Sequence, residues 1–282
     1  KTMNSISVLT YNLHKGMSPL GGSVRLPQMA AALQQLDADV LCLQEVQGRH
    51  QRRQARQAGW PQHDYLAAAL ARQACYGMNA RYDHGHHGNA VLARFPLAMA
   101  ANHDLSVNRL EQRGLLHTVI QPPGWPQPLA CLCGHFNLLA HDRRRQYRVL
   151  LDYLAQYIPP AMPLILAGDY NVIPAARDVY NPAAWADDAL FRPATREAFQ
   201  SLLGLGLTDA LRAVNDEPGQ YTFWDYQAGA WQKNWGLRID HLLMSPQASD
   251  RLIDVGIDSY VRAWEKPSDH VPVWADLDFE TA

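Results

Sequence analysis

The chain has 282 residues, of which 48% are hydrophobic and 18% are charged, and its formal net charge is −2. These values are ordinary for a globular protein and exclude a strongly basic nucleic-acid coat, although not a local basic patch. No apolar run approaches the ~20 residues that a membrane-spanning helix needs. No Gly/Ser-rich or Pro-rich linker divides the chain, so we expect a single domain over residues 3–280.

The four cysteines are Cys42, Cys75, Cys131 and Cys133. Cys42 lies in an apolar run, and Cys131 and Cys133 fall on one face of a predicted strand. This pattern indicates reduced, buried thiols in a cytoplasmic protein, and no secretory signal is visible. A metal site at the Cys-x-Cys pair is the alternative, but no second cysteine pair completes it.

The first elements form a predicted β-α-β unit. A β-rich run over residues 6–11 ends at Asn12, and from Leu26 apolar residues recur at helical spacing. A second strand over residues 40–43 leads directly to Glu45. Such units favour parallel strands, so we expect the two polar groups at one shared sheet edge.

The next stretch is less regular. The basic segment over residues 49–56 is typical of a solvated helix or loop, and residues 64–74 are predicted to be helical. The sequence HGHHG at residues 84–88 resembles a metal site, but glycine between the histidines fixes no ligand geometry. We interpret it as a loop that leads to a strand over residues 89–93, with Asn89 at the start of that strand, facing the cleft.

Two further strands, over residues 113–120 and 129–133, precede a helix over residues 143–157. The helix opens with three arginines at 143–145, which we interpret either as a solvated first turn or as a phosphate contact. His135 follows the second of these strands. It is therefore placed where a strand end meets a cleft.

The stretch PLILAGDYNVIP predicts a buried strand that breaks at a glycine. The apolar run over residues 164–167 ends at Gly168, and Asp169 and Asn171 follow. A carboxylate and an amide at the C-terminal end of a buried strand are typical of a site at a sheet edge.

The long irregular stretch over residues 175–193 is of the kind that is usually functional or mobile. A helix over residues 194–203 follows it, and the final part of the chain contains four predicted strands, over residues 221–226, 237–244, 253–261 and 271–277. Asp240 lies in the middle of an apolar strand, which is costly unless the carboxylate is paired. Many strands with few helices predict two packed β-sheets flanked by helices.

Polar side chains collect at the predicted strand ends, and they are Asn12, Glu45, His135, Asp169, Asn171, Asp240, Asp269 and His270. Carboxylate and amide oxygens favour Mg²⁺ or Mn²⁺ over zinc. A buried aspartate can hold a histidine in one tautomer. No suitable serine or cysteine nucleophile accompanies them. Hydrolysis of a phosphate ester needs such a set: a metal, a group that orients water and an acid for the leaving oxygen.

Seven short motifs occur in a diagnostic order, namely TYN, LQE, GNAVLARFP, GHFN, GDYN, RIDHLL and SDH. In this order they resemble the endonuclease/exonuclease/phosphatase superfamily, which includes DNase I, exodeoxyribonuclease III, sphingomyelinases and inositol phosphatases. The resemblance spans nearly the whole chain. It implies a DNase I-like four-layer α/β-sandwich, with two packed mixed β-sheets flanked by helices, and metal-dependent phosphodiester hydrolysis.

The resemblance also implies metal ligands. Glu45 takes the position of the main Mg²⁺ ligand, with Asn12 and Asp269 near the metal.

The resemblance implies five catalytic residues. Asp169 orients or deprotonates the attacking water, and Asn171 binds the phosphate. His270 stabilises the phosphoryl charge and is oriented by Asp240, which should lie in hydrogen-bond contact with it. His135 assists the leaving group or binds phosphate.

From about residue 163 the chain most resembles exodeoxyribonuclease III and its apurinic-site endonuclease relatives. In that family an aromatic-lined pocket accepts the baseless sugar. The matching positions are Phe223, Trp224, Leu237 and Ile239. The alternative is that these are ordinary core residues, since strands are rich in aromatic side chains.

The front half instead resembles another bacterial branch of the superfamily. His135 stands where exodeoxyribonuclease III relatives carry a tyrosine, and the two groups titrate in different pH ranges. The candidates for substrate binding in this half are Asn89 and Arg113. Such a mosaic fits either a natural recombinant or a deliberately built chimera.

The leading hypothesis is therefore a Mg²⁺-dependent (or Mn²⁺-dependent) DNA repair nuclease with 3′-exonuclease and apurinic/apyrimidinic endonuclease activity. Its partner would be duplex DNA with an abasic site or a 3′ end, and we expect a monomer. The alternative is a phosphodiesterase or phosphatase that acts on a small-molecule or lipid phosphate ester. A non-catalytic scaffold is disfavoured because every expected polar position is filled.

Overall fold

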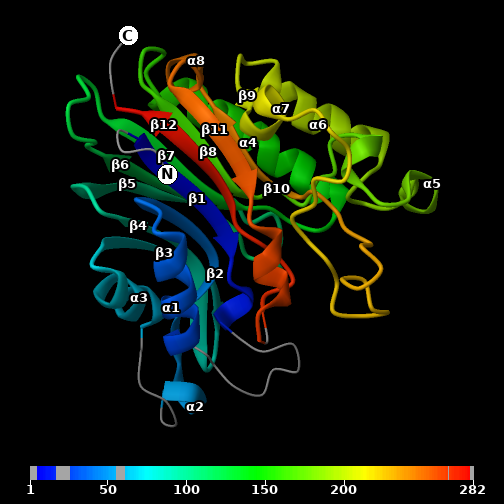
Figure 1. The fold of residues 1–282 in the computed structure, drawn as a ribbon, viewed down its shortest axis with the longest axis horizontal. Helices are drawn as coiled ribbons and strands as arrows, with labels where there is room; N and C mark the ends of the chain where they lie inside the picture. Colours follow the sequence, from blue (N-terminus) through cyan, green and yellow to red (C-terminus); the bar gives the residue numbers. More distant parts are fainter. Residues whose placement is uncertain (1–4, 17–25, 55–60, 266, 280–282) are drawn as a thin grey trace.

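Two β-sheets packed face to face form the centre of the molecule (Figure 1). The structure is a computed structural model that describes residues 5–16, 26–54, 61–265 and 267–279. The first sheet has the strand order β11-β12-β1-β2-β4-β3, and the second has the order β5-β6-β7-β8-β10-β9. Helices α1 and α3 cover the outer face of the first sheet, and α4 and α6 cover the second. The predicted four-layer α/β-sandwich is confirmed.

The first sheet consists of β1 (Ser5–Asn12), β2 (Val40–His50), β3 (Gln73–Tyr82), β4 (Gly85–Ala93), β11 (Leu252–Ile257) and β12 (Val273–Asp278). Strands β1 and β2 are parallel, as the β-α-β pattern predicts, and α1 (Leu26–Leu36) connects them. The remaining pairs are antiparallel, so the sheet is mixed.

The second sheet consists of β5 (Leu97–Asp104), β6 (Gly114–Ile120), β7 (Leu129–His135), β8 (Leu164–Asp169), β9 (Thr208–Asp209) and β10 (Asp240–Met244). Its parallel pair, β7 and β8, is connected by α4 (Ala140–Tyr157). Each sheet therefore has one parallel pair, and such pairs end at a common edge.

The shorter helices lie around these layers, and they are α2 (Gln51–Gln54), α3 (Gln62–Leu70), α5 (Pro182–Trp185), α6 (Pro193–Leu203), α7 (Ala210–Val214), α8 (Pro246–Ser249) and the 3₁₀ turns η1 (His14–Gly16), η2 (Ala176–Asp178) and η3 (Ser259–Ala263). Parts of the predicted domain, at residues 3–4, 17–25, 55–60, 266 and 280, lie outside the described residues.

The layer between the sheets is apolar and contains three of the cysteines. Cys42, Cys131 and Cys133 are free and fully buried, as predicted, while Cys75 is half-buried. The Cys42 and Cys131 sulfur atoms lie 3.3 Å apart. Hydrogen bonds with the Cys131 and Cys133 thiols, together with burial, raise the pKa of Cys42. Cys42 therefore remains a thiol and behaves as a core residue.

Several predicted elements differ from the structure in the front half. The strand predicted over residues 40–43 continues to His50, because a bulge at Glu45 (φ 56°) bends the strand without ending it. The predicted HGHHG loop is wrong for Gly85–Gly88, which pair with β2 and β3 as the start of β4. The sequence analysis also missed the edge strands β3 and β5.

The back half has its own corrections. Residues 221–226 form no regular strand, although Phe223 bridges to Leu237 and to His270. Strand β10 begins at Asp240, so this carboxylate lies at a strand end. The predicted strand over residues 253–261 ends at Ile257 and is followed by η3.

The arginines that open α4 match neither interpretation as a group. Arg143 is 1% exposed and donates to the carbonyl oxygens of Asn137, Leu138 and Ala189. It ties the loop after β7 to the segment before α6. Arg144 and Arg145 are exposed and therefore solvated, but α4 begins at Ala140, so they lie beyond its first turn.

A buried ion-pair network fixes the segment between β8 and β10. Arg238, which is 1% exposed, donates from Nε to Asp178 Oδ1 (2.6 Å) and from Nη2 to Asp209 Oδ2 (2.9 Å). Its backbone NH also donates to the Asp178 carbonyl oxygen. Burial alone would raise the pKa values of both aspartates, but the guanidinium outweighs burial and holds them below their usual range. The long segment over residues 175–193 is therefore anchored to the second sheet.

Substituting this arginine should test the network. We expect Arg238→Met to lower the free energy of unfolding by about 3–5 kcal/mol, because the buried Asp209 loses its ion-pair partner and the buried Asp178 keeps only Arg212. Chemical denaturation at neutral pH measures the change. The matched control is Arg177→Met, which breaks the exposed pair with Asp216 and should cost at most about 1 kcal/mol. Equal losses in the two variants would show that the network contributes no more than a surface pair.

Candidate active site

Three titratable side chains lie side by side because three neighbouring strands are in register. His135 of β7 pairs with Asp169 of β8, and Asp169 pairs with Asp240 of β10. Their exposed fractions are 5%, 2% and 1%. The backbone ladder therefore places two carboxylates and an imidazole in one buried row at the edge of the second sheet.

His270 lies between the two carboxylates. Its Nδ1 donates to Asp240 Oδ2 (2.9 Å), and its Nε2 is 3.6 Å from Asp169 Oδ2. Asp240 is further fixed by the Thr222 hydroxyl, which donates to Oδ2 (2.7 Å). The predicted contact between Asp240 and His270 is thus present. Burial would lower the pKa of His270, but the two carboxylates outweigh it and raise that pKa to about 10.

Asp169 receives hydrogen bonds from two directions. The Asn12 amide donates to Oδ2 (3.1 Å), and the Asn171 backbone NH donates to Oδ1 (3.1 Å). Burial raises the pKa of Asp169 to about 7, with the His270 charge and the Asn12 hydrogen bond acting against it and the Asp240 charge adding to it. A carboxylate that titrates near neutrality suits a general base.

His135 differs from His270 in its charge state. Its Nε2 is 3.4 Å from Asp169 Oδ2. Burial, followed by the positive charges of Arg113 and His270, lowers the pKa of His135 well below its usual value. At neutral pH the ring is neutral, so it can donate one N–H but cannot release a proton as an imidazolium.

The predicted metal ligands border η1, which follows β1 directly. Lys15 Nζ is 3.7 Å from Glu45 Oε2, and His14 Nδ1 is 3.4 Å from Asp269 Oδ1. Burial favours protonation of both carboxylates, yet nearby positive charges lower both pKa values, so both groups are ionised at neutral pH. Asn12 accepts the His14 backbone NH and donates to Asp169, so it connects this turn to the catalytic row.

The donor set fits a hard divalent cation at Glu45. Its Oε2 is buried and accepts no hydrogen bond from any residue that the structure describes. A buried carboxylate oxygen without a hydrogen-bond donor is what we expect of a Mg²⁺ or Mn²⁺ ligand when the ion is not included. The group of Asp169, Asp240 and His270 also has its ligand atoms within 4.8 Å of one another. We assign it no metal, because Asp240 already binds the His270 and Thr222 side chains.

The predicted substrate-binding residues of the back half divide into two sets. Phe223 is half-buried and meets the His270 ring edge-on, with the ring centroids 5.0 Å apart. Trp224, Leu237 and Ile239 are at most 3% exposed and belong to apolar clusters. Only Phe223 borders the catalytic row, and the pocket role of all four remains a prediction.

The front-half candidates lie beside the same row. Asn89 is 1% exposed, and its amide donates to the carbonyl oxygens of Gly114 and Cys133, so it joins the two sheets. Arg113 Nη2 binds Glu111 Oε1 (2.6 Å).

The predicted phosphate ligand Asn171 lies in the back half, in the turn after β8. It has φ 49°, and its amide donates to the Phe136 carbonyl oxygen (2.8 Å), which fixes this turn. The roles of Asn89, Arg113 and Asn171 toward substrate remain predictions.

Sequence reasoning missed four residues at this site, which are His14, Lys15, His87 and Thr222. His14 and Lys15 follow closely after Asn12, so their position beside a strand end could have indicated that they belong to the site. Thr222 precedes the aromatic motif and carried no signal of its own. His87 was hidden by the loop interpretation of HGHHG.

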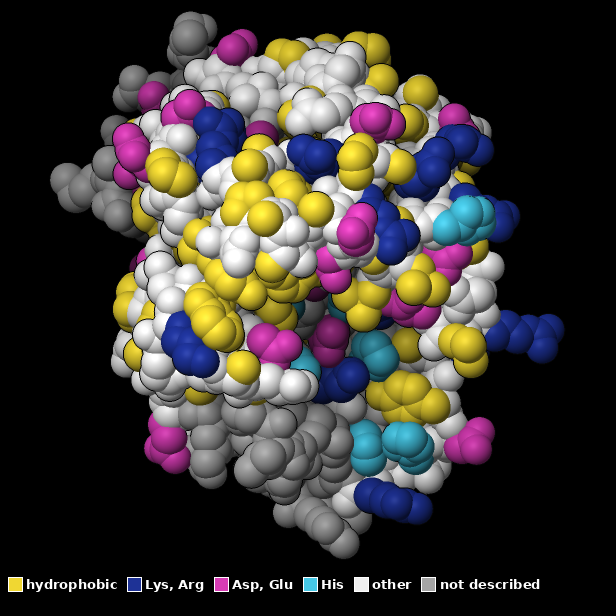
Figure 2. All heavy atoms as spheres, turned by 90° about the vertical axis from the view of Figure 1, so that its right-hand side faces the viewer, with side chains coloured by type: hydrophobic (Ala, Val, Ile, Leu, Met, Phe, Trp, Pro, Cys, Tyr) yellow, Lys and Arg dark blue, Asp and Glu magenta, His cyan; other side chains and the backbone are white. Residues whose placement is uncertain are grey.

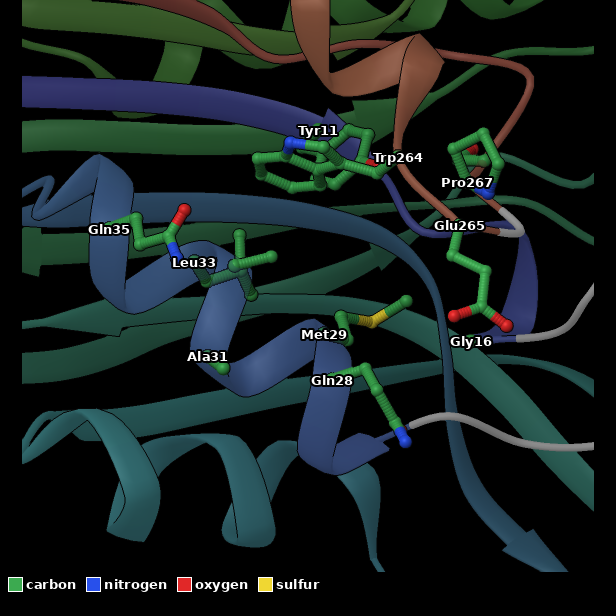
Figure 3. Close-up of a pocket in the computed structure, with 12 residues that line it drawn as sticks. Tyr11, Gly16, Gln28, Met29, Ala31, Leu33, Gln35, Trp264, Glu265 and Pro267 are labelled. Carbon is green, nitrogen blue, oxygen red and sulfur yellow. The ribbon is translucent and has the colours of Figure 1, made fainter.

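The surface agrees with this description. Figure 2 shows a hollow in one face of the molecule in which acidic and histidine side chains gather, with basic side chains at its margin. A separate cavity of about 350 Å³ lies between α1 and a set of residues that comprises Trp264, Glu265, Pro267 and Ser268, and Figure 3 shows Tyr11 and Trp264 on one side of it and Met29 and Leu33 on the other. None of the catalytic row lines this cavity, so it is separate from the catalytic row.

Comparison with known proteins assigns the fold and site to a family. Residues 9–270 match the Endonuclease/Exonuclease/phosphatase family. The chain belongs to this family of hydrolytic enzymes, which generally depend on a divalent metal. The family inferred from the seven motifs is thus confirmed. No helix among the described residues is long and apolar enough to cross a membrane.

Three relatives show the range of similarity. The uncharacterized protein YbhP of Escherichia coli (strain K12) is 36% identical over 170 residues, which are 59% of this chain and 67% of that protein. The exodeoxyribonuclease of Bacillus subtilis (strain 168) is 30% identical over 244 residues, or 86% and 88% of the two chains. The solved structure of the 3′ phosphatase NExo from Neisseria, bound to a product DNA hairpin, has a TM-score of 0.72 at 26% identity and covers 97% of this chain and 99% of that chain.

The charge on His270 can be measured directly. In the metal-free protein we expect its ring to titrate with a pKa of about 10, and Asp240→Asn to lower that pKa because the nearest carboxylate is removed. NMR titration of the ring nitrogens reports both values. Because the folded pKa exceeds the unfolded value of ~6.5, the pair stabilises the fold fully below that pH and the effect is lost as pH rises through the folded pKa.

The control for this titration is Asp254→Asn, which alters an exposed carboxylate of β11. It should leave the His270 titration unchanged. A wild-type pKa near the unperturbed value of ~6.5 would contradict the paired arrangement.

Proposed function

We propose that this protein is a Mg²⁺-dependent phosphodiester hydrolase acting on DNA, with 3′-exonuclease and apurinic/apyrimidinic endonuclease activity. The observation that carries the proposal is Asp169, a buried carboxylate with a pKa of about 7, held 3.6 Å from the His270 imidazolium. The Bacillus exodeoxyribonuclease and the DNA-bound Neisseria phosphatase support the choice of DNA. The buried free thiols are typical of the cytoplasm, and we propose a monomer.

Asp169 is the proposed general base. Water bound beside its Oδ2 would lose a proton to the carboxylate, and the Asn12 amide would keep that oxygen in place. The hydroxide formed would attack the phosphorus of the substrate, the bond between phosphorus and the leaving oxygen would break, and that oxygen would take a proton from solvent water. His270 would donate from Nε2 to a phosphoryl oxygen and offset the charge that develops there, while Asp240 holds Nδ1.

Glu45 and Asp269 are the proposed holders of the divalent ion, which would act as a Lewis acid on the phosphoryl oxygen. Both carboxylates are ionised, and both lie beside η1.

His135 is proposed to bind phosphate. Burial keeps its ring neutral at neutral pH, so its N–H can contact a phosphoryl oxygen. Of the two roles that the resemblance implies, the neutral ring favours phosphate binding over delivery of a proton to the leaving oxygen.

A basic cavity supports an extended anionic substrate. It has a volume of about 440 Å³ and is lined by Arg81, Arg109 and Arg113 together with several asparagines. Arg113, which lines this cavity, also acts electrostatically on Glu45 and His135. A small phosphate ester would leave this cavity unused, whereas flanking DNA phosphates could occupy it.

The first test is incision of a duplex oligonucleotide that carries one abasic analogue. We expect incision with Mg²⁺ and none with EDTA. Asp169→Asn should reduce kcat about 10²–10⁴-fold, because the base that activates water is lost. The control Asp254→Asn changes an exposed aspartate on β11 and should retain full activity. Unchanged hydrolysis by Asp169→Asn, or equal incision in EDTA, would rule out the mechanism.

The second test separates DNA from small esters by salt dependence. Three phosphate contacts predict roughly 40-fold weaker DNA binding between about 50 and 200 mM salt. Arg109→Ala should reduce the slope of log KM against log salt by about 0.9, and the exposed Arg144→Ala on α4 serves as control. The KM for a small phosphodiester should not change. A salt-independent KM for duplex DNA, with efficient turnover of the small ester, would favour a small-ester phosphodiesterase.

A further inference from the structure

A row of aromatic rings extends from beside the proposed catalytic site along the end of the first sheet. Its members are His87, Tyr82, His84 and His50, which we call the His-Tyr row. Successive ring centroids in this order are 5.7, 4.5 and 4.6 Å apart. His87 pairs in the β2–β4 ladder with Gln47, two residues after Glu45. The row therefore starts at the proposed metal carboxylate and runs outward.

The row is held together by polar contacts rather than by apolar packing. The Tyr82 hydroxyl contacts His87 Nδ1 (3.2 Å) and accepts from Gln47 Nε2 (3.5 Å). His84 is exposed, and Tyr82 and His87 are half-buried. Tyr82, the one hydrophobic member of the row, belongs to none of the apolar clusters of the described residues. Apolar packing of Tyr82 therefore does not explain why it lies among the three histidines.

The opposite face of the same hairpin provides a comparison. There Tyr76 stacks on His63 of α3 at 4.2 Å, contacts His86 Nδ1 (3.0 Å) and packs against the apolar cluster under α1 and α3. That set is explained by the packing of a helix on a sheet. Successive residues of a strand point to opposite faces, so His86 and His87 serve different surfaces.

We propose that the His-Tyr row is a stacking platform for an unpaired nucleobase of the nucleic-acid strand held at the catalytic site. The proposal rests on the proposed function, because it takes DNA as the substrate. His84 is exposed and Tyr82 and His87 are half-buried, so these three rings can accept a base by stacking, while ring nitrogens and the Tyr82 hydroxyl at their edges offer hydrogen bonds.

The platform gives the site a way to select its substrate. A base can reach the row only if it is not paired, as at a frayed 3′ end or in a single-stranded overhang. Stacking would then position the neighbouring phosphate at Asp169. A fully paired duplex interior would not gain this contact.

The experiment measures binding without hydrolysis. In an Asp169→Asn background with Mg²⁺, a hairpin with an unpaired terminal 2-aminopurine is titrated, and both its affinity and its fluorescence are recorded, since stacking quenches this base. We expect Tyr82→Ala and His84→Ala each to weaken binding about 5- to 100-fold and to relieve the quenching. Tyr82→Phe keeps the ring and should retain the quenching.

Two controls isolate the platform. His86→Ala changes the neighbouring residue on the opposite face and should leave affinity and quenching unchanged. A hairpin whose terminal nucleotide lacks a base should bind equally to the background protein and to Tyr82→Ala. His84 is exposed, so His84→Ala keeps the test valid should Tyr82→Ala fail to fold.

The outcomes separate this proposal from the proposed function. Unchanged affinity and quenching in His84→Ala and in folded Tyr82→Ala, or no quenching by the background protein, would overturn the platform, whatever the wild-type protein hydrolyses. Absence of Mg²⁺-dependent hydrolysis by the wild type, with the quenching still lost in the row variants, would overturn the proposed activity and leave the platform standing.

Discussion

One imidazolium shared by two buried carboxylates is the interaction on which the site depends. Asp169 and Asp240 are direct partners in the β8–β10 ladder, and two such charges would repel each other in a buried row. His270 lies between them, so one positive ring offsets part of that repulsion. The arrangement sets both unusual pKa values at once: His270 stays charged, and Asp169 becomes a base that titrates near neutrality.

This interaction needs a rigid frame, and a second buried charge network supplies it. Arg238 lies two residues before Asp240 and binds carboxylates from η2 and from β9. The same stretch carries the backbone bridge from Leu237 to Phe223, next to Thr222, whose hydroxyl binds Asp240. Removing the arginine would therefore affect the fold first and the catalytic row only through it. The two networks are linked by backbone, although their charges have separate partners.

The sequence predicted features that follow from apolar pattern and strand direction. The parallel pair of β1 and β2, the polar groups Asn12 and Asp169 at the ends of β1 and β8, and the two-sheet class all follow from buried runs and their connections. The edge strands β3 and β5 were not predicted because neither contains the β-branched residues that are typical of strands: β3 has the sequence QACYGMNARY and β5 has the sequence LAMAANHD. The bulge at Glu45 and the contacts of Lys15 were not predicted, because positive φ values and ion pairs are set by tertiary structure.

The resemblance of the two halves to different branches has a structural consequence at the site. The β7–β8 ladder crosses the region between residues 135 and 163, where the character of the sequence changes, and it pairs His135 with Asp169. The 244-residue Bacillus alignment covers 86% of this chain and therefore spans both halves. The base and the imidazolium come from the back half, whereas Glu45, His135 and the His-Tyr row come from the front half. Both halves therefore contribute to the proposed chemistry: the back half provides the groups that activate water and offset the phosphoryl charge, and the front half provides the metal carboxylate Glu45 and the Asn12 amide that holds Asp169.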